Sequence, residues 1–174
     1  MSEDPRNADG DPPTHSALGS PFPVPARGGG EIRPADWPAG SGYSHGVSSE
    51  GRFIILSGQI GWNPITERLV EGGIAAQTRQ ALANIATLLA AGGAEPAHLV
   101  RLTWFITSRE AYLRERRTIG SVYREVIGRH FPSMSVIVVS TLLEPGAEVE
   151  IEATAVVPAA SAPANSTGAE RRPS

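Results

Sequence analysis

Hydrophobic residues between positions 43 and 157 alternate between a strand-like and a helix-like spacing. Short runs rich in β-branched and aromatic residues are bounded by turn-forming residues, which is typical of strands. Four such runs are predicted as strands: 53–58, 98–107, 133–141 and 147–157. With a further strand beside the segment GYSHGV and two intervening helices, the predicted order is ββ, helix, strand, helix, ββ. This order indicates one α/β domain, which we place at residues 36–158.

Two longer segments repeat their apolar residues with the period of an amphipathic helix. In the first, 74–93, the shared face consists of Ile74, Thr78, Ala81, Leu82, Ile85, Leu88 and Leu89. In the second, 109–131, it consists of Tyr112, Ile119, Tyr123, Val126 and His130. Gly92 and Gly93 are predicted to end the first helix, and Pro132 limits the second. A histidine such as His130 in a last helical turn suits the helix dipole without any catalytic task.

The predicted sheet is apolar on both faces. Met134, Val136 and Val138 point to one side of their strand, whereas Ile137 and Val139 point to the other. Two helices can cover only one face of a sheet of four or more strands. The other face therefore needs a partner, most simply another copy of the chain, and we expect a closed homo-oligomer.

The two ends of the chain differ from the domain in composition. Residues 1–35 and 159–174 are rich in Pro, Gly, Ser or Ala and poor in large apolar residues, so both are expected to be disordered. No apolar run is long enough to span a bilayer, and the first residues lack the basic and hydrophobic regions of a secretory signal. We expect a cytoplasmic protein that does not associate with membranes.

Charge and the absence of two residue types narrow the chemistry. The 174 residues carry a formal net charge of −3, which gives no overall attraction for nucleic acid. The chain contains neither cysteine nor lysine, which excludes thiol nucleophiles, disulfides, cysteine metal sites and lysine Schiff bases. Its four histidines form neither an HExxH motif nor a close pair, so no metal site is predicted.

Five segments in order resemble the Rid (YjgF-like) family: GYSHGV, LSGQIGW, AAQTRQALANIATLLAAGGA, PSMS and VEIEATA. The resemblance spans nearly the whole predicted domain. It implies a chorismate-mutase-like fold, with two helices on one face of a mixed sheet, and a homotrimer with a cleft between each pair of subunits. It also implies hydrolysis of enamines or imines to a 2-oxo acid and ammonia without a metal or organic cofactor.

Four positions keep the residues of the family's site. The resemblance places its tyrosine on Tyr43, its SGQ backbone on Ser57 and Gly58, and its glutamate on Glu150. On this interpretation Tyr43 orients the ligand, and Glu150 passes protons to and from a water that attacks the C=N bond. In the alternative, Tyr43 anchors the first strand, and Glu150 belongs to a solvated acidic face with two other glutamates of its strand.

Three positions depart from the family. Its carboxylate-binding arginine falls on Met134, its asparagine on Gly120, and a frequent cysteine on Val136. A guanidinium donates two charge-assisted hydrogen bonds to a carboxylate, and methionine donates none. The loss weakens carboxylate binding by roughly tens- to thousands-fold. We therefore predict a larger or less charged substrate than the usual free 2-imino acid, with Trp62 and Trp104 either lining the pocket or, as we favour, packing in the core or an interface.

Three functions follow in order of preference. The first is hydrolysis of an enamine, an imine or a related carbonyl compound, and the second is non-catalytic binding of a small metabolite by the trimer. The third is RNA cleavage, an activity attributed to some relatives. The arginines of residues 109–129 are interrupted by glutamates, which favours a solvated helix face over an RNA-binding surface. The expected partners are other copies of the chain and a small molecule.

Overall fold

The computed structural model describes residues 29–159, and its centre is a four-stranded mixed sheet. The strand order is β3-β8-β6-β7. The strands are β3 (Arg52–Ile60), β6 (Leu99–Ile106), β7 (Ser133–Val138) and β8 (Val149–Val157). Strand β8 pairs antiparallel with both neighbours, and β6 pairs parallel with β7. A parallel pair needs a crossover, and the helix between β6 and β7 supplies it.

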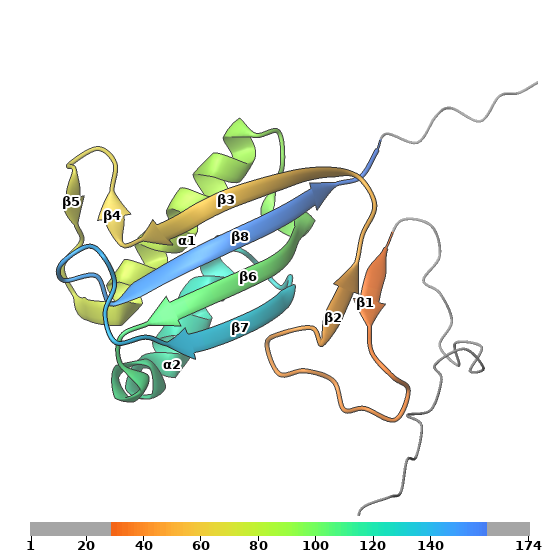
Figure 1. Cartoon of the computed structure of the whole chain (residues 1–174), viewed down its shortest axis with the longest axis horizontal. Helices are drawn as coiled ribbons and strands as arrows, with labels where there is room; N and C mark the ends of the chain where they lie inside the picture. The colour runs from red at the N-terminus through yellow and green to blue at the C-terminus, as the bar shows by residue number, and fades with distance from the viewer. Residues whose placement is uncertain (1–28, 160–174) are drawn as a thin grey trace, which may run out of the picture.

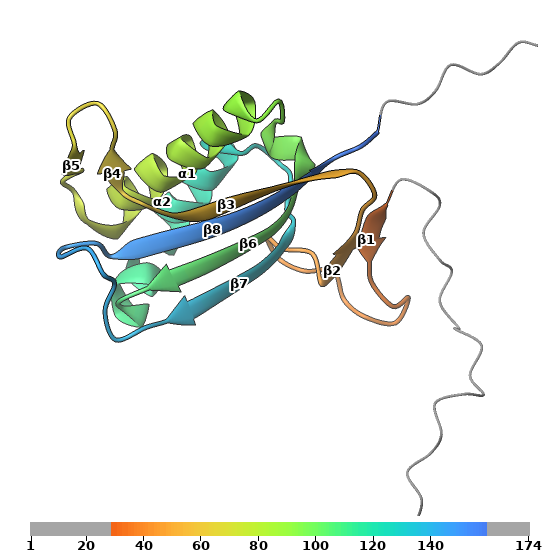
Figure 2. The ribbon, with the colours of Figure 1, turned by 45° about the horizontal axis from the view of Figure 1, so that its top comes forward.

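Helices α1 (Gly73–Ala91) and α2 (Arg109–Val126) lie on the same side of this sheet (Figures 1 and 2). Leu82, Ile85 and Leu89 of α1 are completely buried against β3 and β8. At the start of α2 the Ser108 hydroxyl accepts a hydrogen bond from the backbone N–H of Ala111 at 3.1 Å, as an N-cap does. The α/β fold with both helices on one face of a mixed sheet is confirmed.

The predicted end is right for one helix and wrong for the other. Helix α1 ends at Ala91 with Gly92 as its cap, as expected. Helix α2 ends at Val126, five residues before the predicted 131, because Gly128 adopts a φ of 92° that interrupts the helix. His130 therefore lies outside the helix, where its Nε2 is 2.6 Å from the Leu99 carbonyl oxygen.

Two small hairpins and a turn accompany the main sheet. The hairpins pair β1 (Gly30–Ile32) with β2 (Gly46–Ser48) and β4 (Trp62–Asn63) with β5 (Arg68–Leu69), and the turn is the 3-10 helix η1 (Pro96–His98). Strand β1 falls within residues 1–35, so the prediction of disorder is wrong for Gly30–Ile32, whose backbone pairs with β2. The rest of that prediction, for 1–28 and 160–174, lies outside the described residues.

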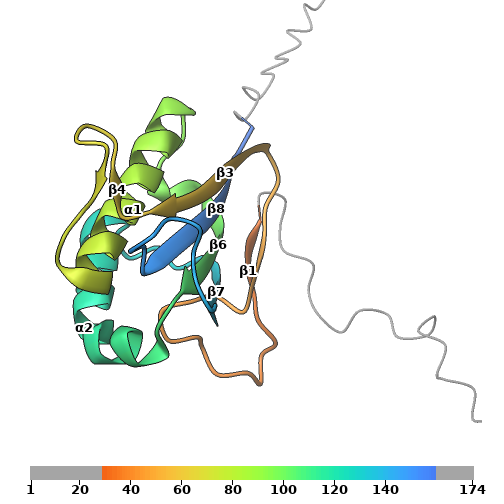
Figure 3. The same ribbon diagram turned by 60° about the vertical axis from the view of Figure 1, so that its left-hand side comes forward.

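The face of the sheet away from the helices is uncovered in the single chain (Figure 3). Phe53 and Ile55 of β3 are 63% and 77% exposed, and Ile137 of β7 is 43% exposed. Monomeric proteins rarely leave apolar side chains of a sheet face open to water. The helices cover one face only, and the open face is apolar at the edge strands β3 and β7, whereas the central strands β8 and β6 place Glu150, Glu152 and Arg101 on it. No helix within residues 29–159 is both long and apolar enough to cross a membrane.

Candidate functional site

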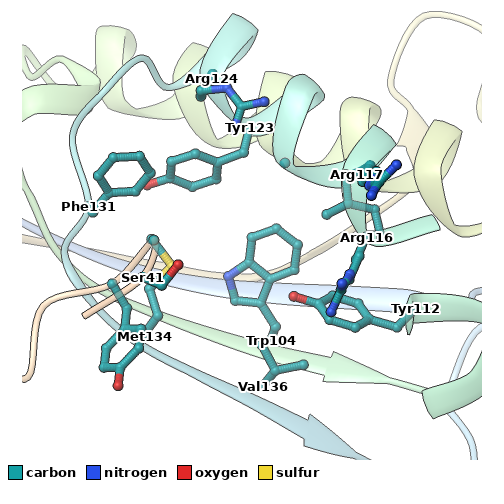
Figure 4. Close-up of a pocket in the computed structure, with 14 residues that line it drawn as sticks. Ser41, Trp104, Tyr112, Arg116, Arg117, Tyr123, Arg124, Phe131, Met134 and Val136 are labelled. Carbon is teal, nitrogen blue, oxygen red and sulfur yellow. The ribbon is translucent and has the colours of Figure 1, made fainter. Parts of the chain in front are cut away.

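A cavity of about 730 Å³ lies between α2 and the β6–β7 edge of the sheet (Figure 4). Helix α2 forms one wall, Trp104 of β6 with Met134 and Val136 of β7 forms the other, and residues 41–43 border the opening. Four of the predicted site residues line this cavity: Tyr43, Gly120, Met134 and Val136. The structure thus brings together Tyr43 and all three positions that depart from the family.

Hydrogen bonds from Ser44 hold Tyr43 at the mouth of this cavity. The Ser44 hydroxyl donates to the Phe131 carbonyl oxygen at 2.6 Å, and the Ser44 N–H donates to the Pro132 carbonyl oxygen at 3.0 Å. Just before Tyr43, Gly42 has a φ of 83°, which turns the chain in a way that side chains disfavour. Tyr43 is 41% exposed and borders the cavity, and its role stays a prediction.

Three aromatic rings form the deep part of the cavity. Tyr123 stacks on Phe131 with ring centroids 5.6 Å apart and lies 6.5 Å from Trp104. The Tyr123 hydroxyl donates to the His130 carbonyl oxygen at 2.7 Å. Burial raises the pKa of Tyr123 and also that of Tyr112, so both phenols stay protonated near neutral pH. The rings provide apolar surface, and neither phenol offers a negative charge to a ligand.

A second group of predicted site residues lies where β3 meets β8. A register shift between Leu56 and Gln59 produces a bulge that contains Ser57 and Gly58. A side chain at Gly58 would begin with a Cβ only 1.8 Å from Oε1 of Glu150. The Glu150 carboxyl group therefore occupies the space that the missing side chain leaves, and only glycine permits this contact. A smaller hollow of about 400 Å³, lined by Gly58 and Trp62, lies beside it.

These two groups are separated by the sheet. Glu150 pairs with Phe105 in the sheet register, and both alternate with buried neighbours that face the helices. Glu150 therefore points to the uncovered face, whereas Met134 is directly opposite the buried Leu102 and points to the helical side. Within one chain, the group of Ser57, Gly58 and Glu150 does not reach the cavity that contains Tyr43.

Glu150 also fits the arrangement expected for its alternative, structural role. It shares the open face with Glu152, which is exposed, while Glu150 itself is partly buried. Nothing in the single chain separates the catalytic role from a solvated acidic face. Within residues 29–159, no three His, Asp or Glu side chains are grouped closely enough to hold a metal ion.

Three arginines of α2 lie at this cavity, a position that the sequence analysis does not predict. Arg116, Arg117 and Arg124 of α2 are exposed, as a solvated helix face requires, yet all three also line the cavity. Trp104 is only 3% exposed and belongs to the core, as expected, but one side of it forms cavity wall. The four-residue spacing of Tyr112, Arg116 and Arg124 was the available signal, because residues at this spacing share a helix face.

Comparisons with known proteins agree with this geometry. Residues 35–157 match the sequence model of a family described as Endoribonuclease L-PSP. The chain is 36% identical to the 2-iminobutanoate/2-iminopropanoate deaminase of Bos taurus over 126 residues, which cover 72% of this chain and 88% of that protein. It is also 36% identical to Protein DfrA of Myxococcus xanthus, over 66% of this chain and 84% of that one.

Solved structures of similar sequence also have a similar fold. A crystal structure of the Rid-family protein YyfB from Yersinia pestis superposes with a TM-score of 0.65 at 32% identity, covering 74% of this chain and 98% of that one. The structure of a putative endoribonuclease from Thermotoga maritima superposes with a TM-score of 0.56 at 34% identity, covering 72% and 91%. The chain described here belongs to the Rid (YjgF-like) family.

Proposed function

We propose that this protein hydrolyses an enamine or imine in clefts formed between copies of itself, most simply in a homotrimer. The observation that supports this most directly is the division of the site. Tyr43 lines a cavity on the helical side of the sheet, whereas Glu150 and the Gly58 bulge lie on the uncovered face. A second copy packed on that apolar face would bring its own Tyr43 cavity next to Glu150 and complete the site.

The reaction in such a cleft needs a single proton-transfer group. Glu150 takes a proton from a water molecule as its oxygen bonds to the carbon of the protonated imine, which gives a tetrahedral amino alcohol. The same carboxyl group then returns that proton to the nitrogen, and it accepts the hydroxyl proton as the C–N bond breaks, ammonia leaves and the carbonyl forms. An enamine enters this route once its carbon is protonated to the imine. Tyr43 donates a hydrogen bond that orients the reacting group.

The substrate differs from the small 2-imino acids named for the bovine relative. Met134 stands where the family places its carboxylate-binding arginine and gives that part of the wall an apolar, adaptable surface. The cavity of about 730 Å³ also exceeds what such a small compound fills. We therefore assign a bulkier imine or enamine, or a related carbonyl compound, as the substrate.

Mixing two inactive variants tests whether the site is shared. Glu150→Gln removes the proton acceptor and Tyr43→Phe removes the orienting hydroxyl, so each pure variant should be strongly impaired with imines that an amino acid oxidase generates from a panel of amino acids. Co-refolded in equal amounts, the two chains should regain activity, since roughly a quarter of the clefts would combine an intact Tyr43 with an intact Glu150. Ammonia release is the measurement.

The size of the assembly must be measured for the wild type and both variants. Light scattering on the wild type and both variants should give the same oligomer, so that lost activity is not lost assembly. A monomeric wild type, or a mixture no more active than the average of its parts, would contradict the shared site.

Non-catalytic binding of a metabolite in the same clefts is the second candidate. Its support is that Gly120, Met134 and Val136, the three departures from the family, all line one cavity. A wild-type protein that binds a ligand but releases no ammonia from any imine tested would favour this candidate. RNA cleavage has less support, because the net charge of −3 and the glutamates among the arginines of α2 disfavour a polyanion.

A further inference from the structure

We propose that the positive charge that recognises the ligand comes from helix α2, where Arg116 and Arg124 attract a carboxylate to the rim of the cavity. The ligand would then be an acid with a bulky apolar or aromatic body that spans from the floor to the helix. This assignment rests on the proposed function only for the statement that the ligand is a substrate.

The geometry of α2 places these arginines on the same face of the helix, two turns apart. Tyr112, Arg116, Gly120 and Arg124 follow one another at four-residue steps and form one row along the helix, and all four line the cavity. Gly120 leaves a gap in the middle of this row. The Arg124 guanidinium uses the gap, since its Nη1 lies 3.5 Å from the position that a Cβ at residue 120 would take.

Two of the positions that depart from the family therefore face the same cavity. The Arg124 guanidinium lies over Gly120, and Met134 leaves the opposite wall without a cation. Within residues 29–159, neither Arg116 nor Arg124 forms an ion pair or a side-chain hydrogen bond, so both guanidinium groups are available to an anion.

An unsatisfied donor in the cavity wall is an independent indication of a ligand. Trp104 is 3% exposed, and its indole Nε1 has no hydrogen-bond partner within the described residues. Buried donors without a partner are rare because each one loses its hydrogen bond to water. The indole nitrogen lies on the side of the ring toward Met134 and Phe131 (Figure 4), so a ligand acceptor that displaces the flexible Met134 side chain would satisfy it.

The two ends of the cavity define the class of ligand. Its floor is formed by Trp104, Phe131, Met134 and Val136, which offer apolar and aromatic contact, and its rim carries the arginines of α2. An imine derived from an aromatic or large aliphatic amino acid places its side chain on the floor and its carboxylate beside the guanidinium groups.

Binding of an inert acid and its uncharged analogue tests this assignment without any turnover. 3-Phenylpropionate and 3-phenylpropionamide have the same apolar body and differ in charge, and calorimetry measures both at low salt. The wild type should bind the acid about tenfold more tightly than the amide, as expected for two partly exposed charge-assisted contacts. The Arg116→Gln/Arg124→Gln double variant should lose that preference while its amide binding stays unchanged.

Arg114→Gln is the matched control, because Arg114 is an exposed arginine of the same helix that does not line the cavity. It should keep the preference for the acid within about twofold. Gly120→Asn places a polar side chain beside the Arg124 guanidinium and should weaken binding of the acid more than binding of the amide. Circular dichroism verifies that all variants are folded.

Several results would overturn the assignment. These are no measurable binding of the acid, equal binding of acid and amide by the wild type, or an equal loss in the Arg114→Gln control. Because the ligands are not turned over, acid-selective binding by a protein that hydrolyses no imine would instead leave this inference standing and refute the proposed catalysis.

Discussion

The two halves of the proposed site differ in what they keep from the family. At the junction of β3 and β8, the resemblance keeps Gly58 and Glu150, and any side chain at position 58 would displace the Glu150 carboxyl group from its present place. In the cavity beside α2, the matching Tyr43 is surrounded by substituted positions, Gly120 and Met134 among them. The β3–β8 junction is a close contact between two residues, whereas the cavity beside α2 is large and can accommodate different side chains.

This difference separates chemistry from recognition. Proton transfer to and from a C=N bond needs one carboxyl group in a fixed place, whatever the rest of the substrate is. The groups that bind the rest of the substrate can change without disturbing that carboxyl group, provided that they lie in a separate part of the structure. In the proposed site they lie on the other side of the sheet, so a change in specificity there would not move Glu150.

Gly58→Ala should have the largest effect on activity. A Cβ at this position would meet Oε1 of Glu150 at 1.8 Å, so the carboxyl group must move. If Glu150 is the proton-transfer group, imine hydrolysis should fall by about a hundredfold or more, within the range for loss of a positioned acid or base. Steady-state ammonia release measures this.

The matched control for that variant is Gly30→Ala, because a Cβ at Gly30 meets no atom within 4 Å. It should leave activity nearly unchanged. Full activity in Gly58→Ala would mean that the position of Glu150 does not affect hydrolysis. The β3–β8 junction would then not be the part of the site that carries out the reaction.

Met134→Arg should have an intermediate effect, in the opposite direction. It restores a guanidinium to the position where the family binds the substrate carboxylate. Hydrolysis of small 2-imino acids, such as those from alanine or 2-aminobutanoate, should rise by roughly tens of fold in kcat/KM. The variant Met134→Gln adds polarity without charge and should produce no such gain. An equal gain in both would indicate that polarity, rather than the missing cation, limits the wild type.

Glu125→Gln should have the smallest effect, although it lies on the helix that forms the cavity wall. Arg79 of α1 donates to Glu125 of α2 at 2.8 Å, and this hydrogen bond and the opposite charge lower the pKa of the Glu125 carboxyl group. A lowered pKa stabilises the fold above about pH 4.5, and the contribution disappears as the pH falls below that value.

Both side chains of this pair are exposed, so the Tm should change by only about a degree at pH 7 and not at all near pH 3. Thermal melts at the two pH values make the measurement. A large loss of ligand binding in Glu125→Gln would show that this pair positions the cavity wall.

Periodicity predicted the fold because the residues that decide it act locally or by alternation. The face of α1 that contains Leu82 and Ile85 is completely buried, and Gly92 ends the helix as a cap should. Helix α2 ends at Val126, before the limit that Pro132 predicts, because Gly128 lies closer to the helix and adopts the left-handed conformation that ends it.

The site was harder to predict because it depends on distances across the chain. The contact of Gly58 with Glu150 follows from a register shift between β3 and β8, which no local pattern indicates. The cavity arginines were recognised as exposed, but their position beside Met134 depends on how α2 packs over β6 and β7. The resemblance supplied the residues of the site without indicating that one chain divides them between two faces.

The place of β8 in the sheet also has a consequence for biosynthesis. This strand, Val149–Val157, is the last of the described elements, yet it lies between β3 and β6. On the ribosome, β3 and β6 are synthesised first and must wait with unpaired edges until β8 emerges. A nascent chain stalled within the loop before β8 therefore has every other element of the domain but cannot close its sheet, which makes it a natural client for chaperones.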